Sequence, residues 1–516
     1  MSWTLPASLE IRHERHFGDR VVRCFAERPA SVYKAFAHAC AADPHAEALV
    51  CAGERLSYAA LAERAAQVSA GLAARGIGRG DRVGMLLGNR VQFAATLLGI
   101  LRLGAIAVPI GTRLQKPEIG FILGQCHARA LVRESSLQSR VPPLELCWDE
   151  SQIEKSDVPP PPVAEVSEED TAIILYTSGT TGRPKGAMLT HFNIAHSLLH
   201  FQHCLRLGPG ERALLAVPAS HVTGVVAILL ATWHARGCAI VMPEFKAREF
   251  LELAARERMT YTILVPAMYN LCLLQPDFER FDLSSWRVGG YGGAPMPEAT
   301  IAALREKLPG LGLHNAYGAT ETTSPTTLMP AEHTAARPDS VGWTVPCGEI
   351  LVVGPDEAEL PPGEAGELWI RGPMVVPGYW DHPEATRQSF TRGYWRSGDV
   401  GSVDAQGFVR VFDRLKDMVN RGGYKVYSVE VENVLGHHPA VLESAIVGKP
   451  CPVLGERVHA FVTLKRPVSE QELKRFCGER LADYKVPETF TLRDEPLPRN
   501  ANGKLLKRAL REAASG

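Results

Sequence analysis

The sequence predicts an α/β protein in which a large N-terminal α/β domain, with parallel sheets and a small β subdomain, is followed by a small α+β domain. Three observations predict this fold. Helical and strand patterns alternate up to about residue 320, short strands bounded by glycine dominate from about residue 340 to 412, and helix–strand alternation resumes after Asp413. A chain of 516 residues, 45% of them hydrophobic, is long enough for roughly three folding units.

The alternation is clearest in the N-terminal part of the chain. Residues 56–76 are predicted to form a helix because apolar side chains recur at steps of three and four, at Leu56, Leu61, Ala65, Val68 and Leu72. The next segment, GIGRGDRVGMLL, predicts a turn and a buried strand. Further on, FAATLLGILRLGAIAVPI predicts a helix, a turn at Gly104 and another strand. Such alternation favours βαβ units and a mostly parallel sheet.

Residues 151–170 interrupt this pattern. They hold four consecutive prolines, at residues 159–162, and an acidic run, which predicts an exposed connector stiffened into polyproline II. The strand TAIILYT follows directly, and the segments GELWIRGPMVVPGYW and GFVRVFD later predict the β subdomain. The chain shows no internal repeat.

Composition limits the function classes. The net charge is −1 and the pI is about 7.0, so no global basic excess suggests nucleic-acid binding. The 11 cysteines include no CxxC pair, which argues against a zinc ribbon and favours free thiols in the cytoplasm. Residues 1–20 do not resemble a signal peptide, and the apolar stretch at residues 222–233 is too short to be a transmembrane segment.

The strongest local motif is YTSGTTGRPKG at residues 176–186, which ends a buried strand. Its three glycines let the backbone approach a phosphate closely. Backbone N–H groups and Ser/Thr hydroxyls donate to phosphate oxygens, and Lys185 adds a positive charge. The order of residues is not that of a Walker A loop. The structural alternative is an exposed Gly/Thr turn.

This motif resembles that of the AMP-forming adenylate enzymes, which include acyl-CoA synthetases, firefly-type luciferases and peptide-synthetase adenylation domains. The resemblance continues in order from about residue 40 to 510. Further matching motifs are PASHVTGV (218–225), YGGAP (291–295), NAYGATE (315–321), YWRSGDVG (394–401), DRLKDMVNRGGYKV (413–426) and LPRNANGKLLKR (497–508).

The resemblance implies a role for each motif. ATP would be bound by Thr177, Ser178, Gly179, Thr180, Thr181, Gly182, Lys185, Gly293, Ala294, Asn315, Ala316, Tyr317, Gly318, Asp399 and Arg414. Asp399 would accept from the ribose hydroxyls. The catalytic residues would be Lys504, Thr320 and Glu321, with Glu321 and Thr181 as Mg²⁺ ligands. The acyl pocket would be lined by His221, Val225, Tyr291, Gly292 and Thr322.

The physical chemistry agrees with these roles. Attack of a carboxylate on the α-phosphate builds negative charge on oxygen, so catalysis depends on positioning and electrostatic stabilisation. Lys504 offers a mobile point charge and Thr320 a hydroxyl donor, while Mg²⁺ on Glu321 would neutralise the pyrophosphate leaving group. Each residue also has a structural alternative: a core histidine at His221, a first-turn acid at Glu321 and a solvated lysine at Lys504.

The resemblance also implies a domain organisation: an N-terminal domain over residues 1–413, a hinge over residues 414–417 with Lys416 at its pivot, and a mobile C-terminal domain over residues 418–516. Three positions depart from the family pattern. Ser428 stands where proline is usual, Asn502 where Ser or Thr is commoner, and Tyr291 where a small residue is common. Lys425, Lys485 and Lys507 are interpreted as surface charges.

The acceptor of the acyl group decides the class of enzyme. Gly422 and Gly423 follow the hinge where acid–CoA ligases let pantetheine pass close to the backbone, which favours coenzyme A. The alternative acceptor is the phosphopantetheine of a separate carrier protein. A luciferase-like oxidation and a non-catalytic nucleotide sensor are further alternatives. The joint presence of Glu321, Asp399, Arg414 and Lys504 argues against the sensor.

Two finer expectations concern substrate and regulation. The candidate pocket walls are mostly apolar and small, which favours a medium aliphatic or aryl acid. Pro498 and the Gly503–Lys504 pair form a P-x-x-x-x-G-K pattern, similar to the pattern around lysines modified by acetyltransferases in bacterial relatives. Acetylation of Lys504 would remove its charge.

Overall fold

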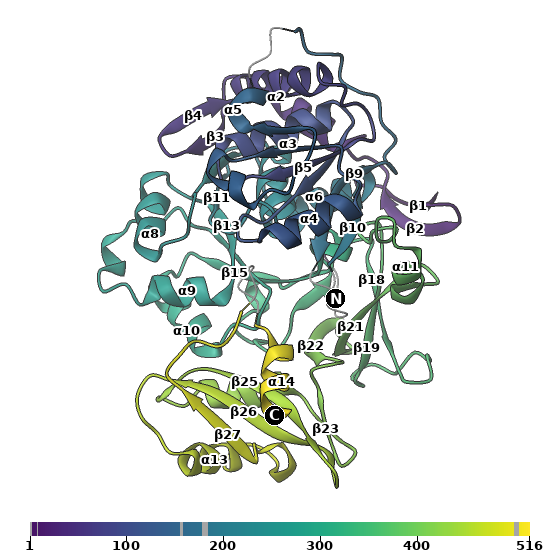
Figure 1. Ribbon diagram of the computed structural model, residues 1–516. Coiled ribbons are helices and arrows are strands. Elements are labelled where there is room, and N and C mark those ends of the chain that lie inside the picture. Colours follow the sequence, from purple (N-terminus) through teal and green to yellow (C-terminus); the bar gives the residue numbers. More distant parts are fainter. Residues whose placement is uncertain (1–2, 8, 155–157, 178–183, 500–504, 516) are drawn as a thin grey trace. The chain divides into compact units, whose positions relative to one another are not determined.

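The computed structural model describes residues 3–7, 9–154, 158–177, 184–499 and 505–515, and it has the mixed α/β architecture that the sequence predicts (Figure 1). The chain forms two compact units. The first comprises Met1–Ile350, Ile370–Arg396 and Gln406–Val409, and the second comprises Leu351–Trp369, Ser397–Ala405 and Arg410–Gly516. The functional division at residue 413 is a separate hypothesis about motion and stays a prediction.

One sheet of the first unit has six strands, in the order β10-β9-β6-β5-β7-β8. Their bounds are β5 (Arg82–Leu86), β6 (Ile106–Pro109), β7 (Ala130–Arg133), β8 (Cys147–Asp149), β9 (Thr171–Thr177) and β10 (Lys185–Thr190). All neighbouring pairs are parallel except β9 and β10. The helix predicted over residues 56–76 is confirmed as α2 (Tyr58–Ala73), which begins where the Ser57 side chain accepts from the Ala60 N–H.

A second sheet of the first unit runs in the order β15-β14-β13-β11-β12-β3-β4. Its strands are β3 (Glu47–Cys51), β4 (Glu54–Ser57), β11 (Arg212–Leu215), β12 (Cys238–Val241), β13 (Tyr261–Leu264), β14 (Val288–Tyr291) and β15 (Gly312–Tyr317). All neighbours from β15 to β3 are parallel, and β4 is antiparallel to β3. The carboxyl ends of the parallel strands therefore lie along one edge, which is where ligands bind in open α/β sheets.

Other elements of the first unit cover these sheets or extend them. The helices are α1 (Val32–Ala42), α3 (Val91–Arg102), α4 (Lys116–Gln125), α5 (Glu150–Ile153), α6 (His191–Cys204), α7 (Ala231–His234), α8 (Ala247–Arg256), α9 (Pro266–Leu273), α10 (Glu298–Lys307) and α11 (Pro383–Ser389). The short strands are β1 (Ile11–His16), β2 (Arg20–Phe25), β16 (Thr327–Leu328), β17 (Gly342–Thr344) and β20 (Phe390–Thr391). Short 3₁₀-helices are η1 (Ser135–Arg140), η3 (Phe278–Arg280), η4 (Thr320–Thr322) and η5 (Ala331–His333).

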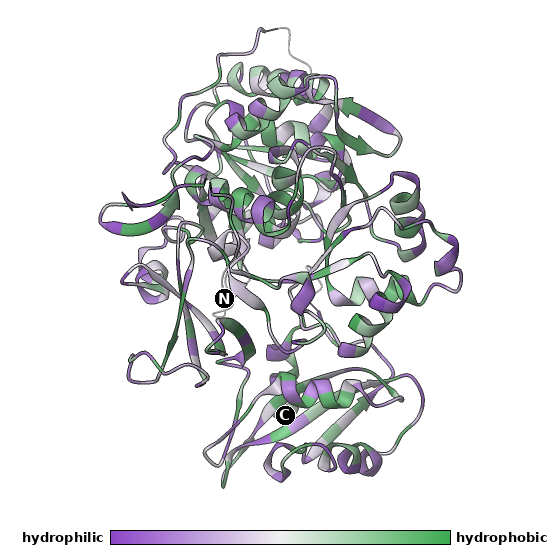
Figure 2. Cartoon of the chain, turned by 180° about the vertical axis from the view of Figure 1, so that it is seen from behind, coloured by the Kyte–Doolittle hydropathy of each residue, from purple (hydrophilic) through white to green (hydrophobic). Residues whose placement is uncertain are grey.

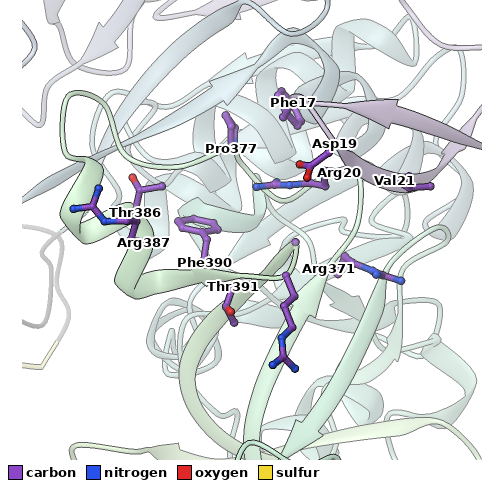
Figure 3. A pocket seen from close by; sticks show the side chains of 12 residues that line it. Phe17, Asp19, Arg20, Val21, Arg371, Pro377, Thr386, Arg387, Phe390 and Thr391 are labelled. Atoms are coloured by element: carbon purple, nitrogen blue, oxygen red, sulfur yellow. The ribbon is translucent and has the colours of Figure 1, made fainter.

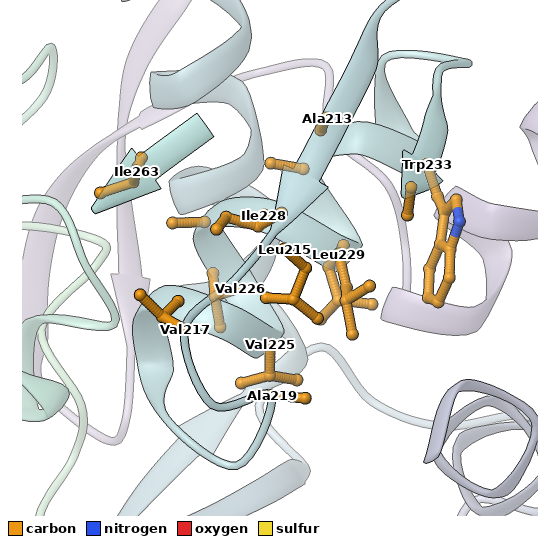
Figure 4. Close-up of a cluster of buried hydrophobic side chains, with 14 of the residues drawn as sticks. Ala213, Leu215, Val217, Ala219, Val225, Val226, Ile228, Leu229, Trp233 and Ile263 are labelled. Atoms are coloured by element: carbon orange, nitrogen blue, oxygen red, sulfur yellow. The ribbon is translucent and has the colours of Figure 1, made fainter. Parts of the chain in front are cut away.

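The apolar stretch at residues 222–233 forms a π-helix, η2 (Thr223–Leu230), that continues into α7. Its side chains pack with those of β11 and β13 in a buried cluster that includes Leu215, Val226 and Ile263 (Figure 4). The central strands are correspondingly hydrophobic, whereas exposed loops are hydrophilic (Figure 2). Within the described part of the chain, no helix combines the length and apolarity needed to span a membrane.

The predicted β subdomain is present as β18 (Glu349–Val353), β19 (Gly366–Arg371), β21 (Tyr394–Val403) and β22 (Phe408–Arg414). The C-terminal part of the second unit has a five-stranded sheet in the order β24-β23-β26-β25, with β27 beside β26. Its elements are β23 (Val419–Arg421), β24 (Tyr424–Val426), α12 (Ser428–Gly436), β25 (Val441–Cys451), β26 (Gly455–Leu464), α13 (Glu470–Gly478), η6 (Asp483–Lys485), β27 (Thr489–Arg493) and α14 (Lys507–Ser515).

Two of the three lysines interpreted as surface charges are placed differently by the fold. The Lys507 side chain is only 12% exposed, and its Nζ lies 2.6 Å from Glu432 Oε1. Lys485 is 20% exposed and pairs with Glu430 at 2.6 Å. The interpretation is wrong for both, because their partners come from α12, about 55 and 75 residues away along the chain, and sequence spacing does not reveal such pairs. Lys425 is exposed.

Buried histidines in and near α6 predict acid sensitivity. Burial lowers the pKa of His196 to about 3 and that of His191 and His234 to about 4, and it lowers the pKa of His200 well below its ordinary value. In the unfolded chain, each of these histidines binds a proton near pH 6.5. The contribution of the buried, neutral histidines to the free energy of unfolding is therefore complete above pH 6.5. It falls as the pH drops towards 4, by about 1.4 kcal/mol per pH unit for each histidine.

We expect His200→Leu to weaken this pH dependence, because it removes one proton-binding group from the unfolded chain. The measurement is the urea midpoint of unfolding at pH 7 and pH 5. The midpoint should fall less on acidification in the variant than in the wild type. The control is the exposed His45, whose replacement by leucine should leave the pH dependence unchanged. Equal pH dependence in His200→Leu and wild type would contradict the argument.

Candidate active site

Two predicted motifs follow neighbouring parallel strands. Tyr291 ends β14 and is paired in register with Asn315 of β15, so YGGAP and NAYGATE leave the same edge of the sheet side by side. Gly292 belongs to this contact: a Cβ on it would lie 2.3 Å from the carbonyl oxygen of Ala316. Only glycine therefore allows the two motif backbones to approach this closely. Gly293 and Ala294 follow in an exposed turn.

Glu321 lies in the one-turn helix η4 and is 8% exposed. Its Oε1 accepts a 2.9 Å hydrogen bond from the hydroxyl of Tyr379. Burial and the nearby Glu321 charge raise the pKa of Tyr379, so the phenol stays protonated and keeps donating. Carboxylate oxygens are ligands that Mg²⁺ prefers, and Glu321 is a fitting donor in a largely enclosed place.

The two strands that carry the Gly/Thr-rich loop lie next to this carboxylate. Thr177 at the end of β9 pairs in register with Lys185 at the start of β10, and η4 packs against β10. The Lys185 ammonium group lies 5.1 Å from the centre of the Tyr379 ring. The structure thus brings Lys185, Tyr379 and Glu321 together. Ser178, Gly179, Thr180, Thr181 and Gly182, with the Thr181 metal site, lie outside the described residues.

The remaining predicted residues of this motif lie around Glu321. Thr320 begins η4 and is partly exposed, as is Tyr317 at the end of β15. Gly318 is exposed, and a Cβ there would lie 3.1 Å from the Thr326 nitrogen. Thr322 is fully buried, and its hydroxyl caps η4 by accepting from the Ala319 N–H at 3.0 Å.

The predicted acyl-pocket residues come from several elements. His221 is half-buried after β11, and its carbonyl accepts the Val225 N–H that starts η2. Val225, Tyr291 and Thr322 are at most 1% exposed, so they lie within the core behind the loops. Gly224 permits the turn, because a Cβ there would lie 2.2 Å from the Pro218 carbonyl oxygen.

Asp399 and Arg414 of the second unit form an ion pair. Arg414 Nε lies 2.7 Å from Asp399 Oδ1, and the Asp399 side chain is 6% exposed. They are neighbours because β21 and β22 are adjacent strands. A carboxylate and a guanidinium held together can accept from and donate to the hydroxyl and phosphate oxygens of one nucleotide.

The predicted hinge and coenzyme A positions also lie in the second unit. Lys416 is exposed in the turn between β22 and β23. Gly422 and Gly423 form the two-residue turn between β23 and β24, with φ of 59° and 92°. Such a hairpin turn by itself requires positive φ at both positions. The coenzyme A assignment of these glycines therefore rests on the resemblance. Lys504 lies outside the described residues.

A cavity of about 610 Å³ in the first unit is lined by other residues. Among the described residues its lining includes Arg20, Arg371 and Arg387 but none of the predicted site residues. Arg20 uses its guanidinium on the backbone carbonyls of Val375 and Val376, and Arg371 and Arg387 lie on opposite sides of the cavity (Figure 3). The arginines therefore do not converge on one ligand position.

Tyr379 is a site residue that the sequence analysis missed. It lies 58 residues after Glu321, in the segment VPGYWDHPE, which carries no motif of its own. The bridge between Tyr379 and Ala187 of β10 brings it to the site. A pattern of residue types along the chain contains no signal for such a contact, because only strand pairing creates it.

Comparison with known proteins identifies the family. A model described as AMP-binding enzyme matches residues 36–380, and one described as AMP-binding enzyme C-terminal domain matches residues 430–504. The chain belongs to the AMP-binding enzyme family. Both the predicted family and the predicted fold class are thereby confirmed.

Several relatives in the AMP-binding family are acid–CoA ligases. The long-chain-fatty-acid–CoA ligase FadD13 of Mycobacterium tuberculosis is 35% identical over 89% of this chain and 93% of that protein. Feruloyl-CoA synthase of an Amycolatopsis species is 35% identical over 91% of this chain and 96% of that protein. The o-succinylbenzoate CoA synthetase of Bacillus subtilis, solved with its acyl-adenylate intermediate, is 30% identical with a TM-score of 0.85, over 93% of this chain and 98% of that one.

Proposed function

We propose the residue roles, the acid class and the regulation of this enzyme as follows. The overall reaction is the one predicted: the enzyme uses ATP to convert a carboxylic acid to acyl-AMP, releasing pyrophosphate, and transfers the acyl group to coenzyme A, giving acyl-CoA and AMP. Mg²⁺ is its cofactor, and ATP and coenzyme A are co-substrates. The observation that carries the residue roles is the contact series from Lys185 through Tyr379 to Glu321.

In the adenylation step, side chains and backbone groups of the enzyme bind and orient the substrates. Lys185 and the loop before it bind the phosphates, and Tyr317 lies against the adenine. Thr320 donates to the α-phosphate, and Lys504 stabilises the charge that develops there. Glu321 and Thr181 hold Mg²⁺, which when bound neutralises the pyrophosphate leaving group. Asp399 and Arg414 orient the ribose.

The acid is proposed to be a medium aliphatic or aryl acid with one carboxylate. None of the proposed wall residues, His221, Val225, Tyr291, Gly292 and Thr322, is an arginine or lysine that would pair with a second carboxylate. Tyr291 stands where a small residue is common in the family, which favours a narrower acyl pocket and shorter acyl groups over long chains. We further propose a cytoplasmic location, which the eleven free cysteines support, and control of Lys504 by a lysine acetyltransferase.

The test is pyrophosphate release by the purified protein with Mg-ATP and a panel of aliphatic and aryl acids, followed by thioester formation with coenzyme A or a phosphopantetheine carrier protein. We expect AMP, pyrophosphate and an acyl-CoA. Release with dicarboxylic acids alone would contradict the proposed acid class. Loading of the carrier protein but not of coenzyme A would contradict the proposed role of Gly422 and Gly423 in binding coenzyme A.

Tyr379→Phe tests the metal site. We expect acyl-AMP formation to fall about 10-fold and the half-maximal Mg²⁺ concentration to rise, because a hydrogen bond to a charged group contributes about 1.5–3 kcal/mol. The matched control is Tyr261→Phe, which removes a buried hydroxyl that donates to the Ala227 carbonyl at 2.8 Å. An equal change of the Mg²⁺ requirement in both variants would show that Tyr379 has only a general structural role.

A further inference from the structure

A cluster of buried polar groups joins three distant stretches of the second unit. Nζ of Lys507, at the start of α14, lies 2.6 Å from Glu432 Oε1 and donates to Ser428 Oγ at 2.5 Å. The Ser428 N–H, at the start of α12, donates to Asp413 Oδ2 at 2.5 Å. The end of β22 and the starts of α12 and α14 are thus held in one hydrogen-bonded set.

The charged groups of this cluster are largely buried, so they must stay close enough to compensate one another's charge. Asp413 is 5% exposed, and the Lys507 and Glu432 side chains are 12% and 18% exposed. Burial raises the pKa of both Asp413 and Glu432, and the single positive charge of Lys507 lowers both. Glu432 also accepts from the Ile446 N–H at 2.8 Å. Removing Lys507 would leave buried acids without their cation, which is costly.

A second contact lies one helical turn further along α14. Arg511 forms an ion pair with Asp417, the last residue of the predicted hinge. Residues 507 and 511 lie on one face of the helix because they are four positions apart. This face therefore holds the chain on both sides of Lys416, reaching Asp413 through Ser428 and Asp417 directly.

Ser428 is one of the three positions at which this chain departs from the family pattern. A proline there has neither an N–H for Asp413 nor a hydroxyl for Lys507. Serine supplies both, and it is fully buried. The departure thus has a structural role: it connects the segment before the hinge to α14. Lys507 in turn follows Lys504 by three positions in the sequence.

We propose that Lys507 is a positioning residue for the adenylation step, which anchors the start of α14, three positions after Lys504 in the sequence, to the segment that flanks the hinge. The inference rests on the proposed catalytic role of Lys504. A catalytic group displaced by about 1 Å can lose about 100-fold in rate. Because transfer to coenzyme A does not use Lys504, loss of the anchor should lower the rate of adenylation much more than the rate of transfer.

The test compares Lys507→Met and Lys507→Arg in the two half-reactions, at a temperature below the melting point of every variant. In Lys507→Met we expect single-turnover acyl-AMP formation to fall about 10- to 100-fold. Transfer from supplied acyl-AMP to coenzyme A should stay near the wild-type rate. Lys507→Arg, which keeps a cation facing Glu432, should restore much of the adenylation rate.

Three further variants keep the test decisive. Lys485→Met removes another partly buried cation of the same unit, paired with Glu430 at 2.6 Å, and should not affect adenylation selectively. If Lys507→Met does not fold, the double variant with Glu432→Gln removes both charges together. Lys504→Ala tests the underlying role. Loss of adenylation in Lys504→Ala but not in the Lys507 variants would overturn this inference alone, and retention in Lys504→Ala would overturn the proposed catalytic role of Lys504.

Discussion

Replacing Lys504 by alanine is expected to lower the rate of acyl-AMP formation by about 100- to 1000-fold, the effect of removing one transition-state donor. Lys504 is proposed to act only while negative charge develops at the α-phosphate. The transfer of a supplied acyl-AMP to coenzyme A forms no such charge beside it and should continue. The measurements are single-turnover acyl-AMP formation and thioester formation, each with purified protein.

The same experiment tests the proposed regulation. Acetylation removes the positive charge of Lys504 and adds bulk, so the acetylated enzyme should resemble Lys504→Ala in both half-reactions. Arg508→Ala is the matched control for loss of a nearby positive charge in the sequence. The Arg508 side chain pairs with Glu512 on the exposed side of α14, so its removal should leave both half-reactions unchanged. Equal loss in both half-reactions of Lys504→Ala would contradict the assignment.

Replacing Lys416 by proline is expected to separate the half-reactions in the opposite sense. The proposed hinge motion requires a large change of φ or ψ at this residue, and proline fixes φ near −65° and restricts Leu415 as well. Lys416 is exposed in a turn, and among the described residues its backbone N–H donates to no other group. We therefore expect the variant to fold and to form acyl-AMP, while transfer to coenzyme A falls steeply.

Lys416→Ala is the control for the hinge, because it removes the charge but leaves the backbone free. Both variants are compared in single-turnover acyl-AMP formation and in transfer to coenzyme A, with melting temperature as the check on folding. If the proline variant transfers as fast as wild type, the pivot lies at another residue or the two steps share one conformation.

The sequence by itself determined the fold class and the family. The spacing of apolar residues that is typical of helices or strands appears within short stretches of the sequence. The helix α2 and the alternating strands therefore follow from the spacing of residues such as Leu61 and Val68. The motif order gave the family because a backbone that approaches phosphate needs glycines and hydroxyl residues close together in the chain. Requirements of this kind can be recognised from residues that are neighbours in the sequence.

Only the tertiary structure decided which distant groups meet. Tyr379 reaches Glu321 through strand pairing across 58 positions, and Lys507 pairs with Glu432 across 75. The interpretation of Lys507 and Lys485 as surface charges failed for this reason. A charged residue has the same local pattern whether it faces water or a partner from another element, because partners are selected by packing and desolvation across the fold.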